Sequence, residues 1–326
     1  MIITRTPLRI TLGGGGTDLP SYYSRRGGAV LSAAINKYIY IAVNQTFTDD
    51  YFIKYSELER TEGVDEIQHP IIREALKMHP VGPAIELVSL ADIPSGTGLG
   101  SSGAFTVGLL RTLYSLKREN IAAGPLAEEA CHIEIERLGR SVGKQDQYIA
   151  AFGGLTNFKI EPTGEVEAEP LDIAHETMMD LEERLLLFFT GYARDAGDIL
   201  EDQKKRSETG DEEMLANLDV VTEIGEQTKQ ALEAGDTHRF GELMHTHWEN
   251  KRKRSEGMSS DAVDGWYEAG RNAGAVGGKL VGAGAGGFLL FYAEDQAPLR
   301  EAMSKEGLRE VRFSFDHDGS QLVTRD

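Results

Sequence analysis

The sequence predicts a two-domain α+β protein, and three observations lead to this expectation. The chain has 326 residues, 40% of them hydrophobic and 27% charged, which is typical of a folded protein with a sizeable core. Strand and helix patterns alternate through the first half, whereas helical periodicity dominates the second half. A polar, turn-rich stretch, "EPTGEVEAEP" at 161–170, separates the two halves. We therefore expect one domain over residues 1–170 and a second over residues 171–326.

Residue type and spacing predict the elements of both halves. Three segments rich in β-branched and aromatic residues predict strands: 38–47, 84–90 and 153–160. Three segments with apolar residues at helical spacing predict helices: 102–118, 124–139 and 144–152. The second half is expected to contain a strand at 184–191, a long helical region from about 196 to 273, and a closing glycine-rich strand-loop-strand.

Charge and composition exclude several classes of function. The chain carries 34 basic and 53 acidic residues, a formal net charge of −19, which disfavours binding to nucleic acid. It has no apolar run long enough to cross a membrane, and its first residues lack the layout of a signal peptide. Cys131 is the single cysteine, and its helical surroundings predict a buried thiol. We expect a cytoplasmic protein, a monomer or homodimer, with no membrane or nucleic-acid partner.

The basic run "KRKR" at 251–254 stands out against this acidic composition. Such a run is typical of the solvated C-terminal end of a helix, which is the interpretation we favour, with a local role in phosphate binding left open. His245 and His247, which precede it, are two residues apart and therefore lie on different helix faces. A metal site is disfavoured, and we expect both histidines on the helix surface or at an interface.

The stretch "PSGTGLGSSGA" at 94–104 indicates a phosphate-binding loop. It lies between an expected strand and an expected helix, where glycines let backbone N–H groups approach an anion at the positive end of the helix. Its "GLGSSG" matches the dinucleotide fingerprint G-x-G-x-x-G, as does "VGAGAGG" at 281–287. Neither match has the strand-turn-helix context of a dinucleotide site, and the chain lacks the P-loop pattern. A phosphate site is the favoured interpretation.

The same loop resembles the central P-x-x-x-G-L-G-S-S-x-A motif of the GHMP kinases, named for galactokinase, homoserine kinase, mevalonate kinase and phosphomevalonate kinase. "RTPLRITLGGGGTDL" at 5–19 resembles the first motif of this family, and "KLVGAGAGGFLLF" at 279–291 resembles its third. The first motif and "GKQDQYIAAFGG" at 143–154 are most similar to the heptose 7-phosphate kinases. The resemblance implies an N-terminal half like domain 2 of ribosomal protein S5 and a ferredoxin-like C-terminal half.

What the resemblance implies for activity is an ATP-dependent sugar kinase. The enzyme would use ATP and Mg²⁺ to phosphorylate the anomeric hydroxyl of a small-molecule sugar phosphate, D-glycero-D-manno-heptose 7-phosphate. A galactokinase-, fucokinase- or mevalonate kinase-like enzyme and a non-catalytic sensor of ATP and sugar are the alternatives. The resemblance places ATP on eight residues of the central loop: Pro94, Gly96, Gly98, Leu99, Gly100, Ser101, Ser102 and Gly103.

Carried over residue by residue, the resemblance also implies the catalytic groups. Asp146 matches the family's catalytic aspartate, which takes or orients the proton of the sugar hydroxyl, and Arg9 matches the arginine beside it. Ser102 matches a Mg²⁺ ligand. The carboxylate ligand would be Glu134 or Glu136, which cannot share one helical face at a spacing of two. Glu134 is favoured, because it keeps the galactokinase-like distance to "KQDQ", whereas Glu136 sits in a mevalonate kinase-like "ER" pair.

The resemblance further implies residues for the sugar. Asp18 matches an aspartate that hydrogen-bonds sugar hydroxyls, although its position fits an N-cap for the following segment nearly as well. Galactokinases have Glu-His where this chain has Gly15 and Gly16, which implies room for a larger or differently branched sugar. Gly284 and Gly286 of the third motif would close over the substrate.

A sugar that already carries a phosphate would need cations from the C-terminal half of the chain. Arg194 in "TGYARDAG" and Lys251 or Arg252 in "HWENKRKR" are the candidates, each of which could instead be a solvated surface residue.

Overall fold

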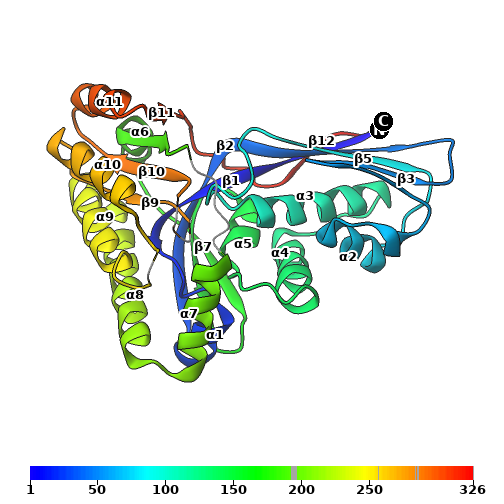
Figure 1. Cartoon of the computed structure of the whole chain (residues 1–326), viewed down its shortest axis with the longest axis horizontal. Coiled ribbons are helices and arrows are strands. Elements are labelled where there is room, and N and C mark those ends of the chain that lie inside the picture. Colours follow the sequence, from blue (N-terminus) through cyan, green and yellow to red (C-terminus); the bar gives the residue numbers. More distant parts are fainter. Residues whose placement is uncertain (192–196, 256, 283, 285, 326) are drawn as a thin grey trace.

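The computed structural model describes residues 1–191, 197–255, 257–282, 284 and 286–325. Within these residues the strands form two sheets, one of eight strands and one of four (Figure 1). Arg194 lies outside the described residues, so its predicted contact with a phosphate stays a prediction.

The larger sheet is built around two long strands from the N-terminus. Its order is β12-β1-β2-β5-β3-β4, and β6 pairs with the first half of β2 and with β7. Apart from the parallel pair of β3 and β5, its neighbours are antiparallel. The strands are β1 (Ile2–Gly14), β2 (Gly28–Gln45), β3 (Tyr51–Lys54), β4 (Leu58–Thr61), β5 (Ile85–Ala91), β6 (Leu155–Ile160), β7 (Val166–Pro170) and β12 (Gln321–Arg325).

Helices α2, α3 and α4 lie together on one side of this sheet (Figure 1). The core between them is formed by apolar side chains of β1, β2 and α3, such as Ile10, Ile41 and Leu109, none of which is exposed. The helices of this half are α1 (Pro20–Arg26), the 3₁₀ turn η1 (Val64–Glu66), α2 (Pro70–Met78), α3 (Ser101–Leu116), α4 (Ala123–Cys131), the π-helix η2 (His132–Arg137) and α5 (Gln145–Phe152).

The smaller sheet is antiparallel, with the order β11-β8-β10-β9. Numbered along the chain this is the order 4-1-3-2, and helices follow its first and third strands, which defines a ferredoxin-like βαββαβ arrangement. The expected α+β fold is therefore confirmed. Its strands are β8 (Leu185–Phe189), β9 (Gly277–Leu280), β10 (Phe288–Tyr292) and β11 (Arg309–Glu310), and its helices are α6 (His175–Arg184), α7 (Gly197–Thr209), α8 (Glu212–Glu233), α9 (Thr237–Lys251), α10 (Asp261–Asn272) and α11 (Gln296–Lys305).

Local signals explain why the long helical region is broken. Gly210 and Gly235 have φ of +76° and +77°, a left-handed conformation that ends a helix. Asp211 and Asp236 follow directly, and their side chains accept hydrogen bonds from backbone N–H groups in the first turns of α8 and α9. Ser260 caps α10 in the same way.

Two expectations about the first half are corrected by the structure. The end of the polar stretch at 161–170 is strand β7, because Val166 and Ala168 alternate with acidic residues and pack against the core. The helix expected over 124–139 is α-helical only to Cys131 and continues as a π-helix. Cys131 is buried and free, as expected.

The termini meet on the same sheet, since Ile2 of β1 pairs with Arg325 of β12. The last residues of the chain therefore belong to the larger sheet, although the preceding 150 residues form the second half. We propose that the boundary between the two domains lies between residues 170 and 171. In the described part of the chain, no helix is both long enough and apolar enough to span a bilayer.

Candidate active site

Arg9 and Asp146 form an ion pair where β1, α5 and the central loop meet. The Nε and Nη2 atoms of Arg9 lie 2.8 and 2.7 Å from Oδ1 of Asp146. Arg9 is buried, and its backbone N–H donates to the carbonyl of Leu99, 3.0 Å away. Its Nη1 donates to the carbonyl of Gly98. Three segments far apart in the sequence are thereby joined around one arginine.

Glycine at two loop positions permits this close approach. A Cβ at Gly100 would lie 3.1 Å from Cγ of Arg9 and 3.2 Å from Cγ of Asp146, and the φ of +77° disfavours other residues. A Cβ at Gly103 would lie only 2.6 Å from Cβ of Asp146. The glycines predicted to contact ATP therefore also set the distance between the loop and the ion pair.

The N-terminus of α3 is open for an anion. Its N-cap is Gly100, so no side chain caps the free N–H groups of the first turn. Gly96 and Gly98 also have positive φ, of +74° and +81°, which folds the loop tightly before the helix begins. Ser101 and Ser102 are the first helical residues. Unpaired N–H groups at a helix N-terminus favour bound phosphate.

Glu134 points into the protein toward this first turn. Its side chain is fully buried, and Oε2 accepts hydrogen bonds from the hydroxyl of Ser102 and, at 3.1 Å, from Nη1 of Arg140. Oε1 accepts from Nε2 of Gln147 at 2.9 Å and from the hydroxyl of Thr106 at 3.2 Å. Burial raises the pKa of Glu134, against the hydrogen bond from Ser102 and the charge of Arg140.

Glu136, the alternative metal ligand, points away from the site. Its side chain is 70% exposed, and it pairs with Nδ1 of His132 at 2.7 Å. The two glutamates are two residues apart and therefore lie on different faces, as expected. They belong to a π-helix, in which the N–H of Leu138 bonds to the carbonyl of Ile133, five residues earlier. Single π-turns inside helices are frequent at functional sites.

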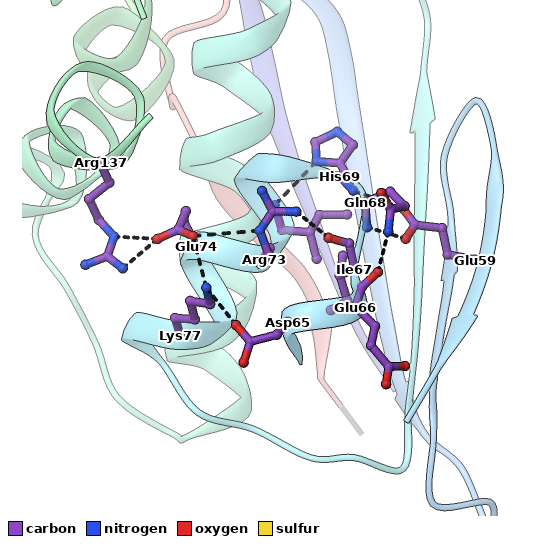
Figure 2. Close-up of polar contacts among 11 residues, drawn as sticks. Glu59, Asp65, Glu66, Ile67, Gln68, His69, Arg73, Glu74, Lys77 and Arg137 are labelled. Atoms are coloured by element: carbon purple, nitrogen blue, oxygen red, sulfur yellow. Dashed lines mark hydrogen bonds and ion pairs between the residues drawn. The ribbon is translucent and has the colours of Figure 1, made fainter. Parts of the chain in front are cut away.

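An ion-pair network anchors the end of the π-helix. Nε of Arg137 lies 2.9 Å from Oε2 of Glu74 on α2. Figure 2 shows Glu74 between Arg137 on one side and Arg73 and Lys77 on the other, with Lys77 also 2.8 Å from Asp65. The network ties η2 to α2 and so helps to hold Glu134 in place.

A cavity beside the α3 N-terminus, which we call the α3 cavity, offers a wall for a base ring. Ser95, Gly96, Ser101 and Ser102 form its loop side, and Arg140 lies at its rim. Its apolar and aromatic side comes from β2, β5, α2, α3 and the segments beside β3, β5 and α2: Ile39, Tyr55, His69, Ile71, Leu90, Ile93 and Phe105.

None of this wall, nor Arg140, was predicted from the sequence. The rings of Tyr55 and Phe105 lie 4.7 and 4.9 Å from that of His69, and burial lowers the pKa of His69 to about 4, so the wall is uncharged at neutral pH. Only the proximity of β2 and β5 to the loop could have pointed to these residues.

Other loop residues serve packing instead of lining this cavity. The side chain of Leu99 is buried, and the carbonyl of Pro94 accepts a hydrogen bond from Thr97 at 2.9 Å. A Cβ at Gly98 would lie 2.6 Å from the carbonyl oxygen of Val281. The central loop therefore touches the third glycine-rich motif through backbone atoms.

The third motif meets this loop at two of its glycines. A Cβ at Gly282 would lie 2.5 Å from Cα of Gly98, and one at Gly287 would lie 2.1 Å from the carbonyl of Thr97. Gly284, predicted to contact the sugar, instead faces Met258 and Ile199. Gly286, which has φ of +151°, does not line the cavity described next, whereas Gly282 does.

A second cavity lies between the two halves of the molecule. Gly14, Gly15 and Gly16 of the first motif form one side of it, next to Arg9. His247, Lys251, Arg254 and Lys279 of the C-terminal half form the other side. We call this space the basic cavity.

The basic run at 251–254 is divided between this cavity and the surface. Lys251 lines the cavity, whereas Arg252 contacts Glu249 at 3.1 Å, and the predicted contact of either with a phosphate stays a prediction. The favoured interpretation of a solvated helix end is wrong for Lys251 and Arg254, which are 8% and 5% exposed. His247 is also buried, and its Nδ1 lies 3.3 Å from Nζ of Lys279, so a surface position is wrong for it.

Arg254 and Lys279 were not named as site residues from the sequence. Arg254 belongs to the run at 251–254, for which only a general role in phosphate binding was left open. Lys279 begins the third motif on β9, and its Nζ reaches the carbonyl of Leu12 on β1 at 2.8 Å.

Asp18 is buried near this cavity but does not line it. Its Oδ1 accepts from the backbone N–H of Gly16 at 3.0 Å, and its Oδ2 accepts from that of Gln145 at 3.1 Å. Asp18 does not cap α1, whose N-cap is Leu19; it accepts at the start of α5 instead. Burial raises the pKa of Asp18, partly offset by these hydrogen bonds. Its predicted contact with sugar hydroxyls stays a prediction.

Comparison with known proteins defines the family. The model of the GHMP kinases N terminal domain matches residues 68–154, and that of the GHMP kinases C terminal domain matches residues 228–308. These matches cover just over half of the chain, and the chain belongs to the GHMP kinase family. The kinase class expected from the three motifs is confirmed.

Individual relatives lie in the sugar-kinase branch. The chain is 32% identical to the D-glycero-alpha-D-manno-heptose 7-phosphate kinase of Campylobacter jejuni, over 98% of this chain and 97% of that protein. A crystal structure described as a sugar kinase from Campylobacter jejuni matches with a TM-score of 0.78 and 29% identity, over 98% and 97% of the two chains. A D-glycero-D-manno-heptose 1-phosphate kinase from Bacteroides thetaiotaomicron matches over 100% of both chains, with a TM-score of 0.80 and 24% identity.

Proposed function

We propose that this GHMP kinase transfers the γ-phosphoryl group of ATP to the anomeric hydroxyl of D-glycero-D-manno-heptose 7-phosphate, giving the 1,7-bisphosphate and ADP. One structural observation carries the proposal: the Arg9–Asp146 pair lies beside both the phosphate-type loop and a cavity lined with cations. The similarity to a heptose 7-phosphate kinase along nearly the whole chain supports the choice of sugar.

The α3 cavity is the proposed nucleotide site. The open N-terminus of α3 and the hydroxyls of Ser101 and Ser102 suit the β- and γ-phosphates. The aromatic wall with Phe105 and the uncharged His69 suits an adenine ring. Arg140 would meet the phosphates, because its Nη1 already lies 2.9 Å from Oγ of Ser102.

Ser102 and Glu134 fit a Mg²⁺ ion. The hydroxyl of Ser102 and the buried carboxylate of Glu134 are hard oxygen donors in direct contact, and Mg²⁺ in kinases is held by few protein oxygens together with substrate phosphates. When bound, the ion would neutralise charge on the transferring phosphoryl group. Burial raises the pKa of Glu134, which a cation would reverse.

Asp146 and Arg9 are the proposed catalytic residues. The carboxylate of Asp146 would accept the proton of the anomeric hydroxyl as its oxygen bonds to the γ-phosphorus and the bond to the β-phosphate oxygen breaks. Arg9 would hold Asp146 in place through its two hydrogen bonds, and its charge would stabilise the transferring group.

A substrate panel with ATP and Mg²⁺ tests the proposal. Heptose 7-phosphate should be phosphorylated with far higher kcat/KM than free heptose, galactose, fucose, mannose or mevalonate, with one ADP formed per 1-phosphate. Higher efficiency with an unphosphorylated sugar or mevalonate would identify a different GHMP kinase activity. Binding of ATP and sugar without ADP release would identify a sensor and overturn the enzyme assignment.

A further inference from the structure

The basic cavity is lined by an unusual number of buried basic side chains. Arg9, Lys251, Arg254 and Lys279 all line it, and no aspartate or glutamate of the described residues does. Arg254, Lys251 and Lys279 are 5%, 8% and 2% exposed. Each buried charge costs several kcal/mol unless an opposite charge accompanies it. Such an arrangement is stable only if something else compensates it.

Arg254 is the least satisfied of these cations. Its Nε donates to Oδ1 of Asn217 at 3.0 Å, and its Nη1 donates to Oε1 of Gln203 at 3.3 Å. Both partners are neutral amides. Its Nη2 is buried and has no hydrogen-bond partner among the described residues. Unpaired buried donors are rare in folded proteins, so one on a guanidinium beside a cavity points to a missing acceptor.

The first motif leaves room for this guanidinium. A Cβ on Gly16 would lie 2.7 Å from Nη1 of Arg254, and Gln203 donates to the carbonyl of Gly16 at 2.9 Å. Asp18, the carboxylate whose charge acts on Arg254, already accepts backbone hydrogen bonds through both oxygens. Because residue 16 is glycine, Arg254 can lie directly against the first motif. Glycine has no side chain that could pair with the guanidinium group.

Among the described residues, the two lysines contact neutral groups. Nζ of Lys279 donates to the carbonyl of Leu12 at 2.8 Å and lies 3.3 Å from Nδ1 of His247. Nζ of Lys251 donates to the carbonyl of Leu280 at 3.0 Å and to that of Gly282. These contacts orient the two Nζ atoms and supply no opposite charge, and burial accordingly lowers the pKa of both lysines.

This cavity is separate from the proposed nucleotide cradle. Ser101, Ser102 and Arg140 line the α3 cavity and do not line the basic cavity, while Arg9, next to Asp146, lines the basic cavity. An anion in the basic cavity would therefore lie on the sugar side of the reacting groups.

Resting on the proposed sugar-kinase function, we infer that Arg254, Lys279 and Lys251 bind the phosphate ester that the sugar already carries. Arg254 is the specificity-determining residue of this subsite, with Nη2 as a donor to the ester. The subsite makes the enzyme select a phosphorylated sugar and orients the opposite end of that sugar toward Asp146.

Arg254→Gln, with Lys253→Gln as the matched control, tests this inference. Lys253 is the adjacent, exposed residue of the same run, and each substitution removes one positive charge. Arg254→Gln should lower kcat/KM for heptose 7-phosphate about 100-fold, since a charged hydrogen bond is worth tenfold to hundredfold per contact. It should change kcat/KM for unphosphorylated heptose and KM for ATP less than threefold. Lys253→Gln should match the wild type with both sugars.

A second measurement reports on the anion without catalysis. Inorganic phosphate, compared with chloride at equal ionic strength, should raise the Tm of the wild type and of Lys253→Gln by more than that of Arg254→Gln, in which only the N-terminus of α3 remains to bind it. If Arg254→Gln does not fold, Arg254→Lys serves in its place, because it keeps the positive charge and removes the guanidinium group with its Nη2 donor.

The outcomes separate this inference from the proposed function. Equal losses with both sugars, a raised KM for ATP, or no phosphate effect on the wild type would overturn the subsite. If the wild type fails to turn over heptose 7-phosphate while phosphate still protects it through Arg254, the sugar assignment fails and the anion site stands.

Discussion

At the scale of single residues, the contacts of Asp146 lead to a prediction about proton transfer. Asp146→Asn keeps an oxygen for Arg9 to donate to, and it removes the proton acceptor. We expect kcat to fall by about 10²- to 10⁴-fold with little change in ATP affinity. Steady-state kinetics and calorimetric titration with ATP measure the two quantities. Near wild-type turnover would mean that another carboxylate serves the hydroxyl.

The two glutamates of η2 allow a matched test of the metal site. Glu134→Gln removes a charge that contacts Ser102, whereas Glu136→Gln removes one that is 70% exposed and faces His132. We expect the Mg²⁺ concentration for half-maximal activity to rise at least tenfold in Glu134→Gln and to stay within twofold in Glu136→Gln. Titration of activity with Mg²⁺ at saturating ATP decides this, and the reverse pattern would move the metal ligand to Glu136.

At the scale of elements, the contact between α3 and α5 depends on a missing side chain. Gly103 is a helical residue of α3, yet a Cβ there would lie 2.6 Å from Cβ and 2.8 Å from the carbonyl carbon of Asp146. Gly103→Ala should push α5 away from α3, lowering stability by about 1–3 kcal/mol and kcat at least tenfold. Chemical denaturation and kinetics measure both effects.

Gly265 of α10 provides the control for this substitution. A Cβ at Gly265 would meet nothing within 4 Å, and the residue is exposed inside a helix. Gly265→Ala should therefore raise stability by about 0.5–1 kcal/mol through helix propensity and leave kcat unchanged. If Gly103→Ala behaved like Gly265→Ala, the close packing of α3 on α5 would not be needed for activity.

At the scale of the whole molecule, the buried cations between the two halves affect stability. Burial, together with the charge of Arg9, lowers the pKa of Lys279 from 10.5 to about 7. Between these values the unfolded chain keeps a proton that the folded protein has released, so stability rises with pH from about 7 to 10. Lys251, whose pKa burial also lowers, acts in the same direction, while His247 beside Lys279 is already neutral.

Lys279→Met tests this pH dependence. It should make the rise in unfolding free energy from pH 7 to pH 9 shallower by up to about 1.4 kcal/mol per pH unit, the slope for one proton. Urea denaturation of the ligand-free protein at several pH values gives both slopes. An unchanged slope would show that Lys279 is not neutralised by folding.

Much of the fold was accessible from local patterns. The strand at 84–90, the helix at 102–118 and the helix at 144–152 agree with β5, α3 and α5 within about two residues. The periodic spacing of apolar residues and the glycine-rich turns between segments predict these elements, and both patterns need only a few neighbouring residues. β7 was missed because an edge strand with one weakly apolar face resembles a polar turn, and the π-helix was missed because apolar spacing does not distinguish it from an α-helix.

The candidate site divides in the same way. The central loop and the residues Arg9, Asp146 and Ser102 stand in motifs whose order along the chain is sufficient to define the kinase family. Lys279 also stands in the third motif, but nothing in that motif marks it as a cavity residue. The aromatic wall around His69 and the cation Arg254 stand in no motif, and they reach their cavities because the start of α2 and the segment after α9 pack beside the motifs.

The sequence by itself determined the family, the phosphate-type loop and the chemical groups available for phosphoryl transfer. Each of these features is formed by residues that are close together in the sequence, so a short motif is enough to identify it. The sequence favoured Glu134 over Glu136 through a family distance, and the tertiary structure places Glu134 against Ser102. The tertiary structure alone decided that Lys251 and Arg254 of the run at 251–254 are buried. Both facts depend on which elements pack against these segments. Packing between distant segments sets the orientation of their side chains, and no local pattern records it.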